Sequence, residues 1–226
     1  MAFLDFLGFR EMIEQDAGPA PPKHLPLILD ALEEIESRAA ESDLEITQFS
    51  DSVILAAEFS PQGFSSLSEA VRDLQRLLIE RSIAIRGGIA MGQHYAVEGR
   101  LFSHALVKAY LLEARQAGVP RVLADRNLLD WVINHQQCTG TIRDRLNNGL
   151  MIDRDGEVFV HYLSETLLES HALLIRKMLT KGREADSNSI ITKAHWMIDY
   201  HQFTAALLDR DGLDTEIASR FTAFSE

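Results

Sequence analysis

Two aspartates are the residues of this chain whose setting most clearly calls for chemistry. Asp5 lies inside the apolar stretch AFLDFLGF, residues 2–9. A short apolar run of this kind is typical of a buried strand. A buried carboxylate without a partner is costly unless it stays protonated. A basic side chain, a set of backbone N–H groups or a metal ion must therefore face Asp5.

The second aspartate, Asp51, lies in QFSDSVIL, where two predicted strands join tightly. If those strands neighbour the first one in a sheet, Asp5 and Asp51 face each other. Two close carboxylates repel, and the pKa of one rises unless cations lie between them. Divalent cations that bind carboxylates and phosphate oxygens relieve this repulsion. An aspartate at a turn is also an ordinary structural residue, so it is the pair that predicts a metal site.

The elements that must position this pair follow from the hydrophobic pattern. Strands are predicted at 2–6, 44–48, 52–59, 83–91 and 121–124, and a β-hairpin turning at Asp155-Gly156. Helices are predicted at 27–39, 65–81, 104–116 and 128–135, then two long ones at 167–179 and 192–208. The glycine pair Gly87-Gly88 predicts a close neighbour on its strand.

The order of these elements predicts the fold class. A strand, a helix, a strand pair, a helix and a strand form the split βαβ or ferredoxin-like pattern, an α+β fold with an antiparallel sheet and helices on one face. The change in character after Ser164 predicts two units, a domain over residues 1–164 and a helical extension over residues 165–226.

Composition narrows the function classes. The net charge of −12 argues against a nucleic-acid duplex or an anionic membrane as partner, since both need a basic face. It does not exclude a mononucleotide, whose phosphates arrive with a divalent cation. Cys138 is the sole cysteine, which excludes a cysteine-rich zinc site. No apolar run is long enough for a spanning helix, and the N-terminus lacks a signal-peptide pattern, so we expect a cytoplasmic protein.

The two aspartate motifs together resemble those of the class III nucleotidyl cyclase catalytic domain. FLDFLGF is similar to the family's first strand, FSDSVIL to its β-hairpin and IAIRGGIAMG to its next strand. The stretch from GRLF to VLAD is similar to the strand, long helix and short strand that follow in the family. The resemblance covers residues 2–162. Within the family it is greatest to the compact pyrimidine cyclases of bacterial Pycsar anti-phage defence, through RGGIAMG, AYLLE and the tail HWMIDYHQF.

This resemblance implies a reaction and a set of site residues. Asp5, Phe6 and Asp51 would hold two Mg²⁺ or Mn²⁺ ions, with the two aspartates as the catalytic residues. Backbone N–H groups of the turn, at Leu7, Gly8 and Phe9 after Phe6, would hold the triphosphate. The ribose 3′-oxygen would then attack the α-phosphorus, and pyrophosphate would leave. The family also implies a homodimer with sites at the interface.

The chain departs from the family where purine cyclases carry an Asn and, four residues later, an Arg. The matching positions are Val107 and Leu111, whose side chains form no hydrogen bonds. Either neighbours take over this work, or the domain is a degenerate cyclase that senses or binds a nucleotide. The neighbours considered are Arg86, Arg100, Lys108 and Arg115. A dinucleotide cyclase of the related palm type is a third alternative, although the glycine-acidic hairpin expected there is replaced by FSDS.

The base-reading positions of the family match Thr47 and Arg100, and neither fits purine recognition. Arginine presents donors only, which suits the O2 and O4 carbonyls of uracil better than the amino group of cytosine. We therefore expect a pyrimidine nucleoside triphosphate as substrate, with UTP preferred over CTP. Arg86 and Lys108 are further expected base or ribose contacts, and a solvated loop position is the alternative for Arg100.

Overall fold

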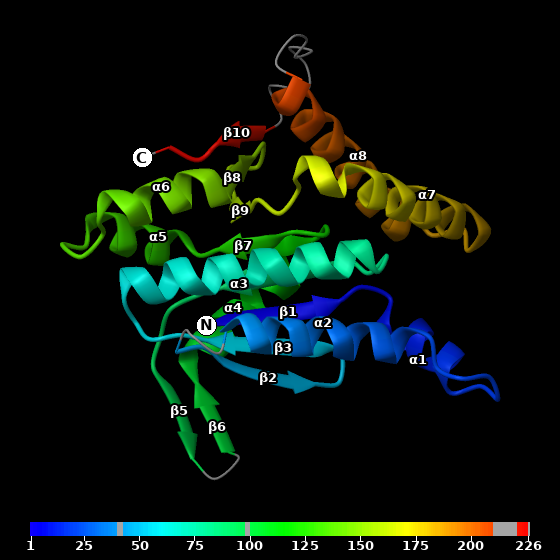
Figure 1. The fold of residues 1–226 in the computed structure, drawn as a ribbon, viewed down its shortest axis with the longest axis horizontal. Helices are drawn as coiled ribbons and strands as arrows, with labels where there is room; N and C mark the ends of the chain where they lie inside the picture. Colours follow the sequence, from blue (N-terminus) through cyan, green and yellow to red (C-terminus); the bar gives the residue numbers. More distant parts are fainter. Residues whose placement is uncertain (40–42, 98–99, 210–220, 226) are drawn as a thin grey trace.

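The computed structural model describes residues 1–39, 43–97, 100–209 and 221–225. Its centre is an antiparallel sheet (Figure 1). β1 (Ala2–Phe6) pairs with β3 (Ser52–Ala56) on one side and with β4 (Ile85–Ile89) on the other, and β2 (Glu45–Phe49) pairs with β3. The resulting order β4-β1-β3-β2 is the ferredoxin-like order. The predicted α+β class is confirmed.

The sheet continues beyond β4 to eight strands in the order β10-β8-β9-β7-β4-β1-β3-β2. β7 (Val122–Ala124) runs parallel to β4, while the other pairs are antiparallel. β8 (Leu150–Asp153) and β9 (Val158–Val160) form the predicted hairpin, with Gly156 at φ 82 in its turn. β10 (Phe221–Ala223) adds an edge strand that sequence patterning had missed.

Helices cover both faces of the sheet, whereas the sequence predicted one face. α2 (His24–Ala39) and α3 (Pro61–Glu80) pack on the first face, and the Ser60 hydroxyl caps α3 by accepting from the Gly63 amide at 2.9 Å. α4 (His104–Leu112) packs on the second face, against β4. A Cβ on Gly88 would lie 2.5 Å from the Ala109 carbonyl oxygen, so the predicted close neighbour of the glycine pair is α4.

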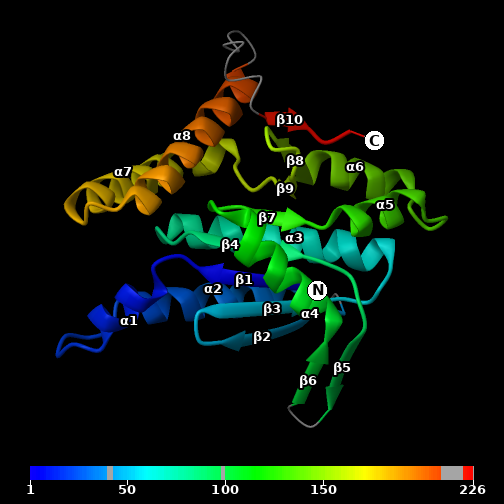
Figure 2. The same ribbon diagram turned by 180° about the vertical axis from the view of Figure 1, so that it is seen from behind.

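Several other elements differ from the predicted ones. α1 (Phe9–Asp16) was missed because its eight residues are mostly polar, and α6 (Gly140–Gly149) was missed for the same reason. The hairpin of β5 (His94–Val97) and β6 (Arg100–Ser103) projects from the body of the molecule (Figures 1 and 2). The hydrophobic pattern did not predict it, because Tyr95, Val97 and Phe102 on one of its faces are exposed. Its second strand lies in the stretch that begins at GRLF, where the family resemblance implied a strand. α5 (Arg126–Asn134) lies close to its predicted position.

The C-terminal helices share a hydrophobic cluster with the strands. A short 3₁₀ turn, η2 (Glu165–Leu167), leads into α7 (Leu168–Glu184), which packs along α8 (Asn188–Asp209). Phe159 and Tyr162 pack in this cluster with Leu174, Trp196 and Tyr200. The two predicted units thus meet through buried aromatic contacts, and the boundary at residue 164 stays a prediction. None of the helices in the described ranges combines the length and apolar character that a membrane crossing requires.

Candidate active site

Asp5 lies where β1 presents its polar side to the second face of the sheet. Burial alternates along β1: Ala2, Leu4 and Phe6 enter the core under α2 and α3, while Phe3 and Asp5 are half-buried on the other side. The Phe3 ring contacts the Tyr110 ring of α4 edge-on, with centroids 5.5 Å apart. The two-residue period of a strand therefore sends Asp5 toward the α4 side of the sheet.

Asp51 lies beside Asp5, at the turn between β2 and β3. The strand register pairs Asp5 with Ser52, and the Phe6 amide donates to the Asp51 carbonyl oxygen at 3.0 Å. Ser50 makes the turn tight by adopting a left-handed conformation, φ 53. The negative charge of Asp51 contributes to a raised pKa of Asp5. The two sequence-predicted aspartates are thus brought together at one end of β1.

The partner that faces Asp5 is Arg86 of β4, directly across the strand pair. The Arg86 Nε atom lies 3.1 Å from Asp5 Oδ2 and 2.6 Å from Glu113 Oε1. The contact with Asp5 has hydrogen-bond geometry, whereas the closer contact with Glu113 is an ion pair without that alignment. A basic side chain, one of the three predicted alternatives, therefore partly neutralises Asp5 within the chain.

Glu113 is the site residue that sequence reasoning missed. Glu113 is the first residue of η1 (Glu113–Ala117), a π-helical segment that continues α4, and it is 3% exposed. Burial raises the pKa of Glu113; Arg86 opposes this rise, and the charges of Asp5 and Asp51 add to it. The available signal was an acidic residue in the apolar stretch AYLLE, the same kind of signal that singled out Asp5. Two carboxylates, those of Asp5 and Glu113, therefore share one guanidinium, and the charge of Asp51 acts on both of them.

The electrostatics of this cluster favour an additional cation. Burial is the main cause of the raised pKa of Asp5; the hydrogen bond and charge of Arg86 lower it, and Asp51 raises it further. Carboxylate oxygens are the ligands that Mg²⁺ and Mn²⁺ prefer. The described residues hold no group of three or more side chains able to ligate a metal. The two aspartates therefore fit divalent ions only together with backbone carbonyls, water or phosphate oxygens.

The turn after β1 supplies two backbone donors. Gly8 adopts φ 81 and is the N-cap of α1, which no side chain caps. The first amides of a helix have no partner within it and favour an anion. The Phe6 and Leu7 amides donate to Asp51 and Ala84, the latter at 2.9 Å. This corrects the expectation that Leu7 donates to a triphosphate and leaves Gly8 and Phe9 for that role. The Phe6 side chain is buried, so it would contact a metal only through its backbone.

The other predicted contacts do not meet the aspartates within one chain. Thr47 is exposed on the outer strand β2, and Arg100 is exposed at the tip of the β5–β6 hairpin, paired with Val97. Lys108 is half-buried on α4. Val107, at a position where purine cyclases carry a polar residue, is 55% exposed. Of the predicted base or ribose contacts, only Arg86 lies at the Asp5 end of β1.

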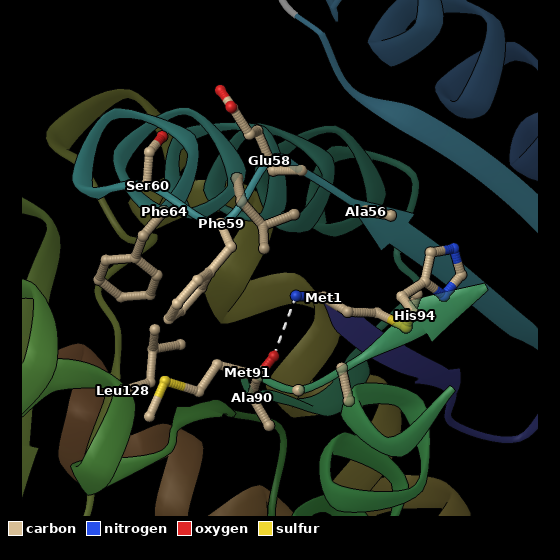
Figure 3. Close-up of a pocket in the computed structure, with 14 residues that line it drawn as sticks. Met1, Ala56, Glu58, Phe59, Ser60, Phe64, Ala90, Met91, His94 and Leu128 are labelled. Atoms are coloured by element: carbon tan, nitrogen blue, oxygen red, sulfur yellow. Dashed lines mark hydrogen bonds between the residues drawn. The ribbon is translucent and has the colours of Figure 1, made fainter. Parts of the chain in front are cut away.

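A cavity lies at the opposite end of β1 and is separate from this cluster (Figure 3). Its volume is about 60 Å³, and Phe59, Phe64, Met91 and Leu128 give it apolar walls. Ligand pockets are usually several times larger than this. The cavity is therefore too small for a nucleotide, and the chemistry of the chain concentrates at the Asp5 end of the strand.

The solved structures to which the chain is similar include three of adenylyl cyclases. No protein-family model and no curated protein matches the chain. The crystal structure of the adenylyl cyclase CyaB from P. aeruginosa is 13% identical, with a TM-score of 0.44, over 73% of this chain and 93% of that one. A bacterial light-regulated adenylyl cyclase is 16% identical, with a TM-score of 0.43, over 78% of this chain and 95% of that one. Another structure of such a cyclase is 14% identical, with a TM-score of 0.43, over 76% and 55%.

Proposed function

We propose that this chain is a metal-dependent nucleotidyl cyclase that converts a pyrimidine nucleoside triphosphate, UTP before CTP, into a 3′,5′-cyclic mononucleotide and pyrophosphate. The observation that carries this proposal is the meeting of Asp5 and Asp51 at the end of β1, next to the uncapped N-terminus of α1. The two carboxylates that could bind cations and the backbone amides that could bind phosphates therefore lie at the same end of β1. By the family resemblance, the product would be a second messenger in anti-phage signalling.

The residues divide the work according to their chemistry. Asp5 and Asp51 would hold two Mg²⁺ or Mn²⁺ ions, which supply Lewis-acid activation of the 3′-hydroxyl and charge neutralisation of the triphosphate. The Gly8 and Phe9 amides would orient the phosphates at the start of α1. Arg86, held by Glu113, places a fixed positive charge beside the metal-binding carboxylates. There it can stabilise charge that develops on the reacting phosphate. It would replace the arginine that purine cyclases carry at the position of Leu111.

We further propose that the active form is a homodimer. Exposed apolar side chains gather on the β5–β6 hairpin and the neighbouring face of α4: Tyr95, Val97, Phe102, Val107 and Tyr110. Tyr95 and Phe102 face each other across the hairpin, 60% and 69% exposed. Apolar patches of this kind mark interaction surfaces. A second copy would cover this patch and bring the base-reading residues Arg100 and Thr47 to a site that one chain leaves incomplete.

A second candidate function is a nucleotide-binding module without turnover. The ion pair of Arg86 with Asp5 favours it, because a divalent ion at Asp5 must compete with a guanidinium already in place. The apolar positions Val107 and Leu111 favour it as well. This candidate predicts that nucleotides raise the melting temperature of the protein and that no product forms.

Incubation of the purified protein with ATP, GTP, CTP and UTP in turn, each with Mn²⁺, distinguishes the two candidates. The cyclase proposal predicts a cyclic product and pyrophosphate, most from UTP. Product from ATP alone would overturn the pyrimidine assignment. Stabilisation by nucleotide without any product would favour the binding module.

A further inference from the structure

The C-terminal helices place cations at the phosphate-binding turn. In Figures 1 and 2, the joined ends of α7 and α8 lie on the same side of the molecule as α1. Lys181, near the end of α7, has its Nζ atom 3.6 Å from the position that a Cβ on Gly8 would occupy. The same ammonium forms an ion pair with Glu11, in the first turn of α1. Lys181 therefore lies directly over the turn that follows β1.

A second lysine of the C-terminal helices is influenced by the charge of Arg86. Lys193, in the first turns of α8, donates to the Ser189 hydroxyl at 2.6 Å and lies within electrostatic reach of Arg86. Burial lowers the pKa of Lys193, and the charge of Arg86 lowers it further. Two cations from distant parts of the sequence, Arg86 and Lys181, thus lie at one end of β1. This convergence occurs in a chain whose net charge is −12.

α7 and α8 form a helical hairpin, the α7–α8 hairpin, whose position is fixed by packing and by hydrogen bonds. Lys177 donates to the Ser82 hydroxyl at 2.9 Å, in the loop before β4. Leu7, in the phosphate turn itself, packs against the hydrophobic cluster that includes the C-terminal helices. Gly182 allows α8 to approach closely, since a Cβ there would lie 2.8 Å from Ile191 Cγ1. Lys181 is therefore held over the turn by an anchored pair of helices.

We propose that the α7–α8 hairpin is a cover of the active site within the same chain and that Lys181 binds the terminal phosphates of the nucleoside triphosphate. The inference rests on the proposed function, because it takes the turn at Gly8 as the triphosphate site. Without nucleotide, Glu11 holds the Lys181 ammonium near this position. A triphosphate at the Gly8 and Phe9 amides carries more negative charge than one carboxylate and takes over the ammonium. The C-terminal extension thereby becomes part of the substrate site.

Binding measurements with and without the nucleoside test this role. Isothermal titration with inorganic tripolyphosphate, UTP and UMP, each with Mg²⁺, is carried out on the full-length protein. Lys181→Met is expected to weaken tripolyphosphate and UTP binding by about tenfold or more, the size of one charge-assisted hydrogen bond. UMP binding should stay unchanged, and Lys181→Arg should restore most of the lost affinity. Arg176→Met is the matched control, because it removes a positive charge from an exposed position of the same helix that takes no part in anchoring the hairpin.

Removal of the competing carboxylate provides an independent readout. Glu11→Gln frees the Lys181 ammonium and should strengthen tripolyphosphate binding by a few-fold. A merely structural ion pair would give no gain, and that result would count against the proposal. Equal losses in Lys181→Met and Arg176→Met, equal losses for UTP and UMP, or no loss at all would each overturn it.

The outcome also separates this inference from the proposed function. Tripolyphosphate binding that depends on Lys181, in a protein that forms no cyclic product, would support the anion site and contradict the cyclase. Turnover of UTP with unchanged UTP affinity in Lys181→Met would support the cyclase and overturn the role of Lys181. Failure of the wild-type protein to bind tripolyphosphate would also overturn that role.

Discussion

Two arginines of neighbouring strands each meet two carboxylates, yet their surroundings differ. Arg121, just before β7, is 4% exposed and uses all three nitrogens: Nε and Nη2 donate to the Ala117 and Gln116 carbonyls, and Nη1 and Nη2 donate to Asp153 and Asp155. Arg86 reaches its carboxylates through Nε alone, and in the described part of the chain its Nη atoms form no hydrogen bond.

The carboxylates respond to these arginines in opposite ways. Hydrogen bonds and charge from Arg121, with further backbone hydrogen bonds, hold the pKa of Asp155 below its usual value despite burial. Burial raises the pKa of Asp5 and of Glu113, and Arg86 does not offset it. The network around Arg121 is complete and acts as a structural link, which the Trp196 indole joins by donating to Asp153 at 2.6 Å. The Arg86 cluster is incomplete, as expected of groups that await a ligand.

The largest expected effect comes from removal of either metal-binding carboxylate. Asp5→Asn and Asp51→Asn should each lower the rate of cyclic nucleotide formation by about a thousandfold or more, because transition-state charge stabilisation is lost. The stability of the protein without metal should hold or rise, because a like-charge repulsion is relieved. Initial rates with Mn²⁺ and thermal unfolding check both statements. A folded variant with near-normal turnover would show that the pair is structural.

Exchange of each arginine for methionine measures the difference between the two networks directly. Arg121→Met leaves Asp153 buried without its cation and should lower the free energy of unfolding by about 3–5 kcal/mol. Arg86→Met should cost less than about 2 kcal/mol, since burial already raises the pKa of both carboxyl partners and each can take up a proton when the guanidinium is removed. Urea unfolding at neutral pH gives both values. Equal losses would mean that Arg86 is as structural as Arg121.

The pH dependence of stability should differ in sign between the two networks. A raised folded-state pKa means that Glu113 destabilises the fold once pH exceeds its ordinary value of 4.5. Glu113→Gln should therefore raise stability at pH 7, with a gain that disappears below about pH 4. The lowered pKa of Asp155 gives the opposite sign, so Asp155→Asn should lower stability at pH 7. That loss should disappear as pH falls through the lowered pKa of Asp155, below 3.8. Unfolding curves measured across this pH range give the stability of each variant relative to the wild type. A change of the same sign in both variants would contradict the contrast between the two networks.

The smallest expected effect concerns Arg100 at the tip of the β5–β6 hairpin. If a second copy brings it to the base, Arg100→Ala should lower kcat/KM for UTP by about tenfold and change the values for CTP and ATP less. Steady-state kinetics with the three nucleotides measures this selectivity. An equal loss on all three would indicate phosphate binding or a structural role, and no loss would indicate a solvated residue.

The sequence was sufficient for the ferredoxin-like arrangement of β1 to β4 and for the meeting of the two aspartates, because strand periodicity and a tight hairpin determine both. It did not predict how β7 to β10 extend the sheet. It was insufficient for the Arg86–Glu113 pair. That pair depends on how α4 seats on Gly88 and on the π-helical segment that follows it, which are tertiary features. The position of Lys181 was equally hidden, because a lysine near a polar linker looks like a solvated residue until α7 is packed. The hydrophobic pattern did not predict the β5–β6 hairpin, because the apolar side chains of Tyr95, Val97 and Phe102 are exposed and give no alternation of buried and exposed positions.

The most direct measurement is the conversion of UTP with Mn²⁺ by wild-type protein, Asp5→Asn and Asp155→Asn, assayed side by side at a temperature where all three are folded. Asp155→Asn is the matched control, because it removes one arginine-paired carboxylate from the structural network. We expect cyclic UMP and pyrophosphate from the wild type and from Asp155→Asn, and a rate lower by about a thousandfold or more from Asp5→Asn. Absence of product from the wild type, or equal product from all three, would contradict the assignment of the active site to the Asp5 end of β1.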